Sequence, residues 1–184
     1  PIIKRCFEKN KKCDCWKSIK TPIAFVNILL RYRIVEEIME EIIQEKISAD
    51  HLLYVSLKYT KTCDVIMNLI IRWRKMIETS IDAILIEAKR KKKISAVTTS
   101  PVKKIEQVRT LFKNDKNFQE VIDLYEMFRK IEGLRIERIG EFRKNVTLKI
   151  LYRGKEINVN LEQLKIYAEM LEKFISTTKQ FLLR

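Results

Sequence analysis

The chain has 184 residues, a net charge of +14 and a hydrophobic fraction of 46%. A chain this long and this apolar can bury a core, which excludes an intrinsically disordered protein. Three glycines are too few for the glycine-rich loops of P-loop or Rossmann nucleotide binders, and a lone histidine, His51, excludes metal sites built on histidine pairs.

Residues 1–38 are expected to form a basic N-terminal extension, followed by a single mainly helical domain over residues 39–184. Three cysteines lie in this extension, at Cys6, Cys13 and Cys15. A zinc site would need Cys63 or His51 as the fourth ligand, but Cys-x-Cys is not the usual Cys-x-x-Cys zinc knuckle. We therefore expect incidental thiols, a reducing cytoplasmic compartment, and neither metal nor cofactor.

The segment Pro22–Leu30 is apolar and follows two lysines, an outline shared with secretory signals, but no small-residue cleavage site follows it. A helix packed on the body is the favoured interpretation, capped by Thr21 and running to about Lys46. Another possibility is that the native chain starts at Met39. No apolar run approaches the ~18 residues of a transmembrane helix, so no membrane partner is expected.

The stretch Ser48–Lys93 organises the chain, because it holds neither glycine nor proline and its apolar or small residues recur every three or four positions. This spacing predicts one helix of about 45 residues that begins with Ser48 as its N-cap. The alternative is a break within Tyr59–Thr62, where two threonines lower helix propensity and Thr62 can cap a second helix. Tyr59 and Trp73 belong to the apolar stripe and are expected in the core.

Shorter elements follow. Residues 94–100 are expected to be a linker, and Ser100-Pro101 to start a helix that ends near Lys113. The next helix is predicted to begin in a capping box from Asn117 to Glu120 and to stop at Gly133.

Alternating apolar residues on either side of Arg153-Gly154 predict a β-hairpin at about residues 146–159, with Ile150 opposite Ile157 and Leu148 opposite Val159. Residues 134–142 are a candidate third strand. A final helix is predicted from the capping box at Asn160 to about Leu183. The expected fold is mainly α, a long helical hairpin or bundle with one C-terminal β-hairpin packed on helices.

The positive charge lies in blocks, which favours a polyanion-binding face. Residues 89–113 hold nine Lys/Arg against one Asp/Glu, and residues 135–155 hold seven against two. We expect these blocks to form one surface that binds the phosphate backbone of RNA or DNA, reading shape, since aromatic residues for base stacking are not evident. The candidate binding residues are Lys89, Arg90, Lys91, Lys92, Lys93, Arg135, Arg138, Arg143, Lys144, Lys149, Arg153 and Lys155.

A basic surface with no nucleic-acid role is the simplest alternative, and the long helix supports another, a homo-oligomer or adaptor formed through helices. No catalytic motif is present, and His51 is interpreted as an ordinary helix residue. The sequence therefore favours a binding module over an enzyme.

Asp50–Thr62 (DHLLYVSLKYTKT), the basic run Lys89–Lys93 and Glu141–Leu148 (EFRKNVTL) are similar to an uncharacterised archaeal protein family, over about residues 45–180. That resemblance implies no activity. The helical hairpin also loosely resembles HEPN-type domains, some of which are ribonucleases with an arginine four to six residues before a histidine. Glu45, Lys46 and Ile47 occupy those positions before His51, so the resemblance does not extend to ribonuclease activity.

Overall fold

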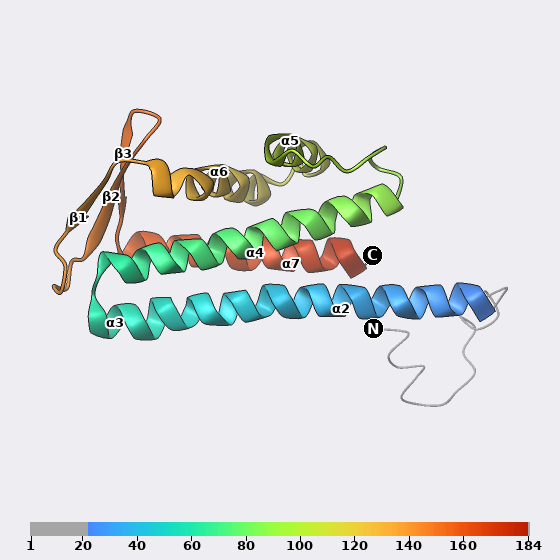
Figure 1. Ribbon diagram of the computed structural model, residues 1–184, viewed down its shortest axis with the longest axis horizontal. Helices are drawn as coiled ribbons and strands as arrows, with labels where there is room; N and C mark the ends of the chain where they lie inside the picture. Colours follow the sequence, from blue (N-terminus) through green and yellow to red (C-terminus); the bar gives the residue numbers. More distant parts are fainter. Residues whose placement is uncertain (1–21, 184) are drawn as a thin grey trace. The chain divides into compact units, whose positions relative to one another are not determined.

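The structure is a computed structural model that describes residues 22–183, and the chain divides between Glu37 and Ile38 into two units. Thr21 and the N-terminal cysteines, and with them the predicted cap and the zinc hypothesis, lie outside the described residues. The prediction of a mainly α fold with a C-terminal β-hairpin packed on helices is confirmed (Figure 1). The helices are α2 (Pro22–His51), α3 (Leu57–Thr60), α4 (Cys63–Arg90), α5 (Pro101–Leu111), α6 (Lys116–Lys130) and α7 (Leu161–Leu183).

The prediction of one continuous helix over Ser48–Lys93 is wrong, and so is Ser48 as its N-cap. The first helix continues past Ser48 to His51, passes through a π-helical turn at Leu52–Ser56 and ends with α3. Lys61 then takes a left-handed conformation with φ 48°, and Thr62 is extended, so the chain reverses and α4 begins at Cys63. The alternative break within Tyr59–Thr62 is the correct one.

The stripe that suggested continuity consists of two separate buried faces. Residues 38–51 of α2 run antiparallel to α4 (Figure 1), and the buried carboxylate of Glu45 accepts hydrogen bonds from Arg72 at 3.0 Å and Lys75 at 2.5 Å. Burial alone raises the pKa of Glu45, but these two hydrogen bonds lower it below its ordinary value. These two ion pairs thus hold α2 against α4.

Helix α4 lies at the centre of the second unit, where it contacts α5, α6, α7 and strand β2. Its buried residues include Ile66, Ile70, Trp73 and Ile77, spaced as an amphipathic helix requires. Trp73 stacks on Phe128 of α6, with ring centroids 6.1 Å apart. The expectation that Trp73 lies in the core is confirmed.

The shorter elements largely follow the sequence signals. Pro101 opens α5 and Asn160 caps α7, accepting from the Gln163 N–H at 2.9 Å. The predicted capping box at Asn117 is wrong, because Asp115 caps α6 and accepts from the Phe118 N–H at 3.0 Å. The Asn117 side chain instead donates to the carbonyl of Met170 in α7.

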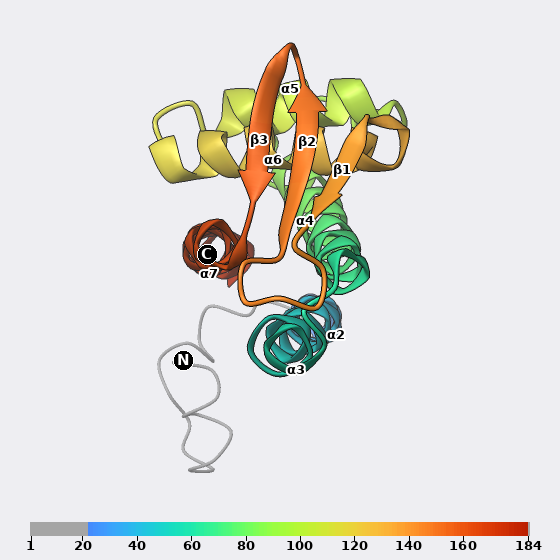
Figure 2. The same ribbon diagram turned by 90° about the vertical axis from the view of Figure 1, so that its left-hand side faces the viewer.

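Three antiparallel strands, β1 (Ile136–Ile139), β2 (Thr147–Tyr152) and β3 (Lys155–Val159), form a sheet in the order β1-β2-β3. The predicted register is confirmed, since Ile150 pairs with Ile157 and Leu148 with Val159. Arg153 and Gly154 both have positive φ, as a two-residue hairpin turn requires. One sheet face packs toward the helices, and the other faces the viewer in Figure 2.

Candidate functional site

The run Lys89–Lys93 and the β1–β2 loop, which hold most of the predicted binding residues, lie at opposite ends of α4. The β1–β2 loop contacts the first turn of α4, where Glu141 accepts a hydrogen bond from the Cys63 N–H at 3.1 Å. The run Lys89–Lys93 follows the last turn of the same 28-residue helix, about 40 Å away at 1.5 Å per residue. The structure therefore does not bring the Lys89–Lys93 run and the loop into the single compact surface that we expected.

Several cations of the Lys89–Lys93 run hold the end of α4 in place. Arg90 makes two hydrogen bonds to the buried carboxylate of Glu87, at 2.6 and 2.8 Å. Lys91 lies 3.2 Å from the same carboxylate and donates to the carbonyl of Phe181 in α7. Lys89, Lys92 and Lys93 are exposed and form no ion pair within residues 22–183, and of these three only Lys93 lies over an aromatic ring.

On the exposed face of the sheet, two carboxylates offset the charge of Lys149, one of the predicted binding residues. Lys149 lies at the centre of that face, 3.0 Å from Glu156 on β3 and 3.9 Å from Glu137 on β1. Arg135 and Lys155 are exposed at the sheet's margins and pair with no acid in the described part of the chain. The sheet face as a whole is close to neutral and is a poor phosphate-binding surface.

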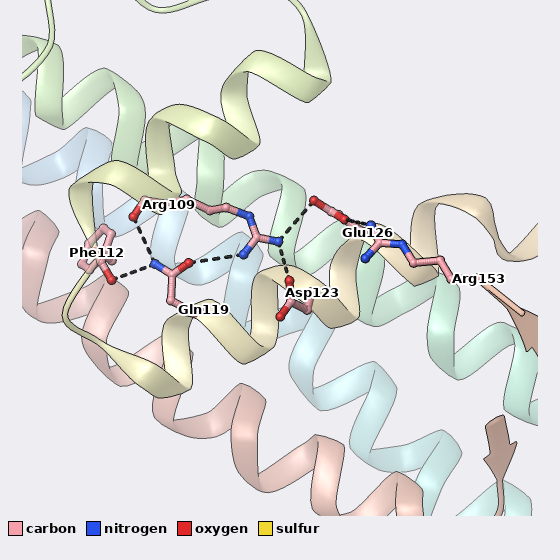
Figure 3. Close-up of polar contacts among 6 residues, drawn as sticks. All are labelled: Arg109, Phe112, Gln119, Asp123, Glu126 and Arg153. Carbon is pink, nitrogen blue, oxygen red and sulfur yellow. Dashed lines mark hydrogen bonds and ion pairs between the residues drawn. The ribbon is translucent and has the colours of Figure 1, made fainter. Parts of the chain in front are cut away.

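Arg153 at the hairpin turn belongs to a polar network with α5 and α6 (Figure 3). It donates to Glu126 at 2.6 Å, and the other oxygen of that carboxylate accepts from Arg109 at 3.2 Å. Arg109 also contacts Asp123 and Gln119, and the Gln119 amide donates to the carbonyls of Arg109 and Phe112 at the end of α5. Each guanidinium in this network already has a carboxylate partner, so its role is to join α5, α6 and the hairpin.

The β1–β2 loop, residues 140–145, is fixed to the turn between α3 and α4. The Phe142 N–H donates to the carbonyl of Lys61 at 2.8 Å, and Glu141 accepts from the Cys63 N–H. Arg138 bonds to Asp64 at 2.8 Å and lies 3.5 Å from Glu141. Figures 1 and 2 both show the loop beside α3 and the start of α4. These contacts give the loop one defined position.

The anchored loop displays free cations around an exposed ring. The Phe142 side chain is among the most exposed apolar groups, at 77%, and the next two residues, Arg143 and Lys144, are exposed without an ion pair in residues 22–183. Lys58 in α3 and Lys61 in the turn after it add two more positive charges. We call this the loop surface, comprising Lys58, Tyr59, Lys61, Phe142, Arg143 and Lys144.

The acids nearest the loop surface are already paired. Asp64 and Glu141 both lie against the guanidinium of Arg138. Arg138 balances only one of these two carboxylates, but Lys58, Lys61, Arg143 and Lys144 still leave the loop surface with a net positive charge. An anion approaching Arg143 and Lys144 therefore meets exposed donors within a net positive surface.

Sequence reasoning predicted Arg143 and Lys144 but missed the aromatic residues beside them. Tyr59 was expected in the core, yet it is 74% exposed, because α3 ends one residue later and the chain reverses. Phe142 was included in a candidate strand, although Gly140 and Asn145 on either side of it are turn formers. A lone aromatic residue between turn formers, followed by two cations, was the signal available in the sequence.

Other candidate groups are ordinary structural residues. His51 is exposed at the end of α2. Cys63 is fully buried, and burial together with the nearby Glu141 raises the pKa of its thiol, so it is a weak nucleophile. Across residues 22–183, no group of three or more His, Cys, Asp or Glu side chains is arranged to hold a metal ion.

Comparisons with known proteins do not add to this geometry. No protein-family model, curated protein or solved structure matches the chain. Among the described helices, none combines the length and apolar character needed to cross a bilayer.

Proposed function

We propose that the protein binds nucleic acid, and that the loop surface is where it contacts the phosphate backbone. The observation that carries the proposal is the pair Arg143 and Lys144, both exposed and unpaired within residues 22–183. They lie on a loop that two hydrogen bonds hold against Lys61 and the start of α4, beside the ion pair of Arg138 in β1 with Asp64. Lys and Arg side chains of this kind bind phosphates by displacing condensed counterions. A fixed loop also loses little conformational entropy on binding.

The rival basic block, Lys89–Lys93, is weaker support for the same function. Two of its five cations, Arg90 and Lys91, are already bound to Glu87. Lys93 lies over the Phe181 ring, 5.2 Å from its centroid. This leaves Lys89 and Lys92 as its two free charges, with no exposed aromatic residue described beside them.

The test compares two double charge reversals that change net charge equally. Arg143→Glu/Lys144→Glu alters the loop surface, and Lys89→Glu/Lys92→Glu alters the other end of α4. Binding to a labelled RNA of roughly 20 nucleotides, single-stranded and as a duplex, is measured between about 50 and 200 mM salt. We expect the loop variant to lose at least about tenfold in affinity, and the slope of log K against log salt to fall by about 1.4 to 1.8, the value for two lost phosphate contacts.

The matched variant should lose only a few-fold, through the general field of the protein, with the slope little changed. Equal losses in both variants would show that the loop is not the site. No binding by the wild-type protein, or binding that salt does not weaken, would overturn the proposal itself.

A second candidate function, self-association through a helix, is favoured by one observation. Ile43 and Ile47 are exposed one turn apart on α2, at 38% and 54%. Apolar residues four positions apart on one helix face are typical of helix-helix contacts. Such association would appear as concentration-dependent sedimentation at micromolar protein, and a strict monomer would exclude it.

A further inference from the structure

Phe142 has an unusual backbone conformation for an exposed aromatic residue. Its φ is 63°, in the left-handed region that non-glycine residues rarely adopt. Its ring lies 77% exposed and makes no ring contact in the described part of the chain, so packing does not compensate for the conformation. A strained residue that the fold nevertheless holds in place is often part of a binding or catalytic site.

The surrounding contacts hold this conformation firmly. The Phe142 N–H is bound to the Lys61 carbonyl, and the Arg143 N–H donates to the Gly140 carbonyl at 3.0 Å. Gly140 has φ 66°, and a Cβ there would lie 2.9 Å from the backbone oxygen of Asn145, so the turn tolerates only glycine. The loop therefore presents the Phe142 ring to solvent in a defined position.

A second exposed ring lies in the last turn of α3, just before the turn that Phe142 contacts. Tyr59 is 74% exposed and precedes by two residues the Lys61 carbonyl to which Phe142 is bound. The ammonium of Lys58 lies 5.8 Å from the centre of the Tyr59 ring. Two exposed rings thus lie on the two segments that the Phe142–Lys61 hydrogen bond joins, each beside exposed cations.

We propose that Phe142 and Tyr59 stack against unpaired bases, so that the loop surface takes single-stranded nucleic acid. This inference rests on the proposed function, because Arg143 and Lys144 must hold the backbone for the rings to reach the bases. Rings stack on bases only when the base faces are accessible, and in a duplex neighbouring base pairs cover them. The exposed rings therefore favour binding of single strands, whereas the sequence alone suggested recognition of the shape of the nucleic acid.

An anionic membrane is the other surface that an exposed phenylalanine beside cations can contact. The residues around Phe142 favour nucleic acid, because Glu141, Arg143, Lys144 and Asn145 are all polar or charged. Interfacial membrane binding needs a wider apolar face than two separate rings. Vesicle binding is therefore an outcome that the experiment must be able to show.

The experiment measures fluorescence anisotropy of a labelled oligouridine of about 12 nucleotides and of a duplex of equal length, with the full chain. Phe142→Ala removes the ring, and Phe142→Tyr keeps an aromatic ring at the same position. We expect Phe142→Ala to weaken single-strand binding by roughly 5- to 100-fold, the loss typical of one stacking contact. The salt slope should stay unchanged, because a ring releases no counterion.

The tyrosine variant should bind within about twofold of wild type, and Tyr59→Ala should weaken single-strand binding in the same direction as Phe142→Ala. Far-ultraviolet circular dichroism confirms that each variant is folded. Duplex binding should not change in either ring variant. A loss of duplex binding equal to the loss for single strands would overturn the stacking assignment.

The outcomes separate this inference from the proposed function. If Arg143→Glu/Lys144→Glu abolishes binding while Phe142→Ala has no effect, the phosphate site stands and the stacking inference fails. If neither variant weakens binding, both fail. If wild type ignores oligonucleotides but binds vesicles with about one-third anionic lipid, and Phe142→Ala removes that binding, the surface is a membrane contact and both are overturned.

Discussion

At the C-terminal end of α4 the cations of Lys89–Lys93 mostly serve the fold, whereas at the N-terminal end the cations of the β1–β2 loop face solvent. Two cations of the first group, Arg90 and Lys91, are bound to one buried carboxylate, Glu87. The second lies beside two acids that Arg138 already binds. Positive residues in a sequence therefore differ in how much charge they offer to a partner, and the difference lies in which of them the fold pairs with an acid.

The largest expected effect comes from a substitution at Glu87, which tests this comparison. Glu87→Gln removes the buried charge that holds Arg90 and Lys91, and we expect the free energy of unfolding to fall by about 2 kcal/mol, typical of hydrogen bonds to charged groups. Urea denaturation measures the loss. Because two cations lose their carboxylate, nucleic-acid affinity should rise by at most about twofold, through the general field of the protein. A clear gain in affinity would show that the Lys89–Lys93 end is itself a phosphate site.

A change at Glu141 tests the contact that holds the loop against α4. Glu141→Ala removes the acceptor for the Cys63 N–H, and we expect a loss of about 1 kcal/mol in unfolding free energy, as for a lost helix N-cap. Single-strand affinity should fall several-fold, because a loosened loop must be ordered on binding.

The matched control is Glu141→Gln, which keeps an oxygen acceptor at the same place. It should retain most of the stability and affinity of the wild-type protein, since the pair with exposed Arg138 is worth little. If both variants bind like wild type, loop anchoring does not contribute to binding.

Local signals in the sequence were sufficient to predict several elements of the fold. The hairpin register followed from alternation around Arg153-Gly154, and the start of α7 from the capping box at Asn160. The helix break was harder to predict, because the apolar stripe keeps its spacing across Lys61 although the two halves pack in different directions. The spacing of apolar residues shows which face of a helix is buried. It does not show a chain reversal when the spacing continues unchanged across it.

The candidate site depended on contacts between distant residues. The partner of Arg153 is Glu126, 27 positions away, and the carboxylate against Arg138 is Asp64, 74 positions away. Sequence composition counted all these arginines as available charge. Only the tertiary arrangement separates them from Arg143 and Lys144, and only it shows that Phe142 faces solvent.

The smallest expected effect compares two left-handed residues, one at each end of α4. Phe142 has φ 63° and Lys92 has φ 56°, and asparagine adopts this conformation more readily than either. Phe142→Asn and Lys92→Asn should therefore each raise the free energy of unfolding by about 0.5 kcal/mol, measured by urea denaturation. Only Phe142→Asn should weaken single-strand binding, because only it removes a stacking ring. Lys92→Asn is the control, because it shows how much of any change in affinity comes from relieving backbone strain and losing one cation. A stabilised Phe142→Asn variant that binds like wild type would mean that the strain at Phe142 serves no binding role.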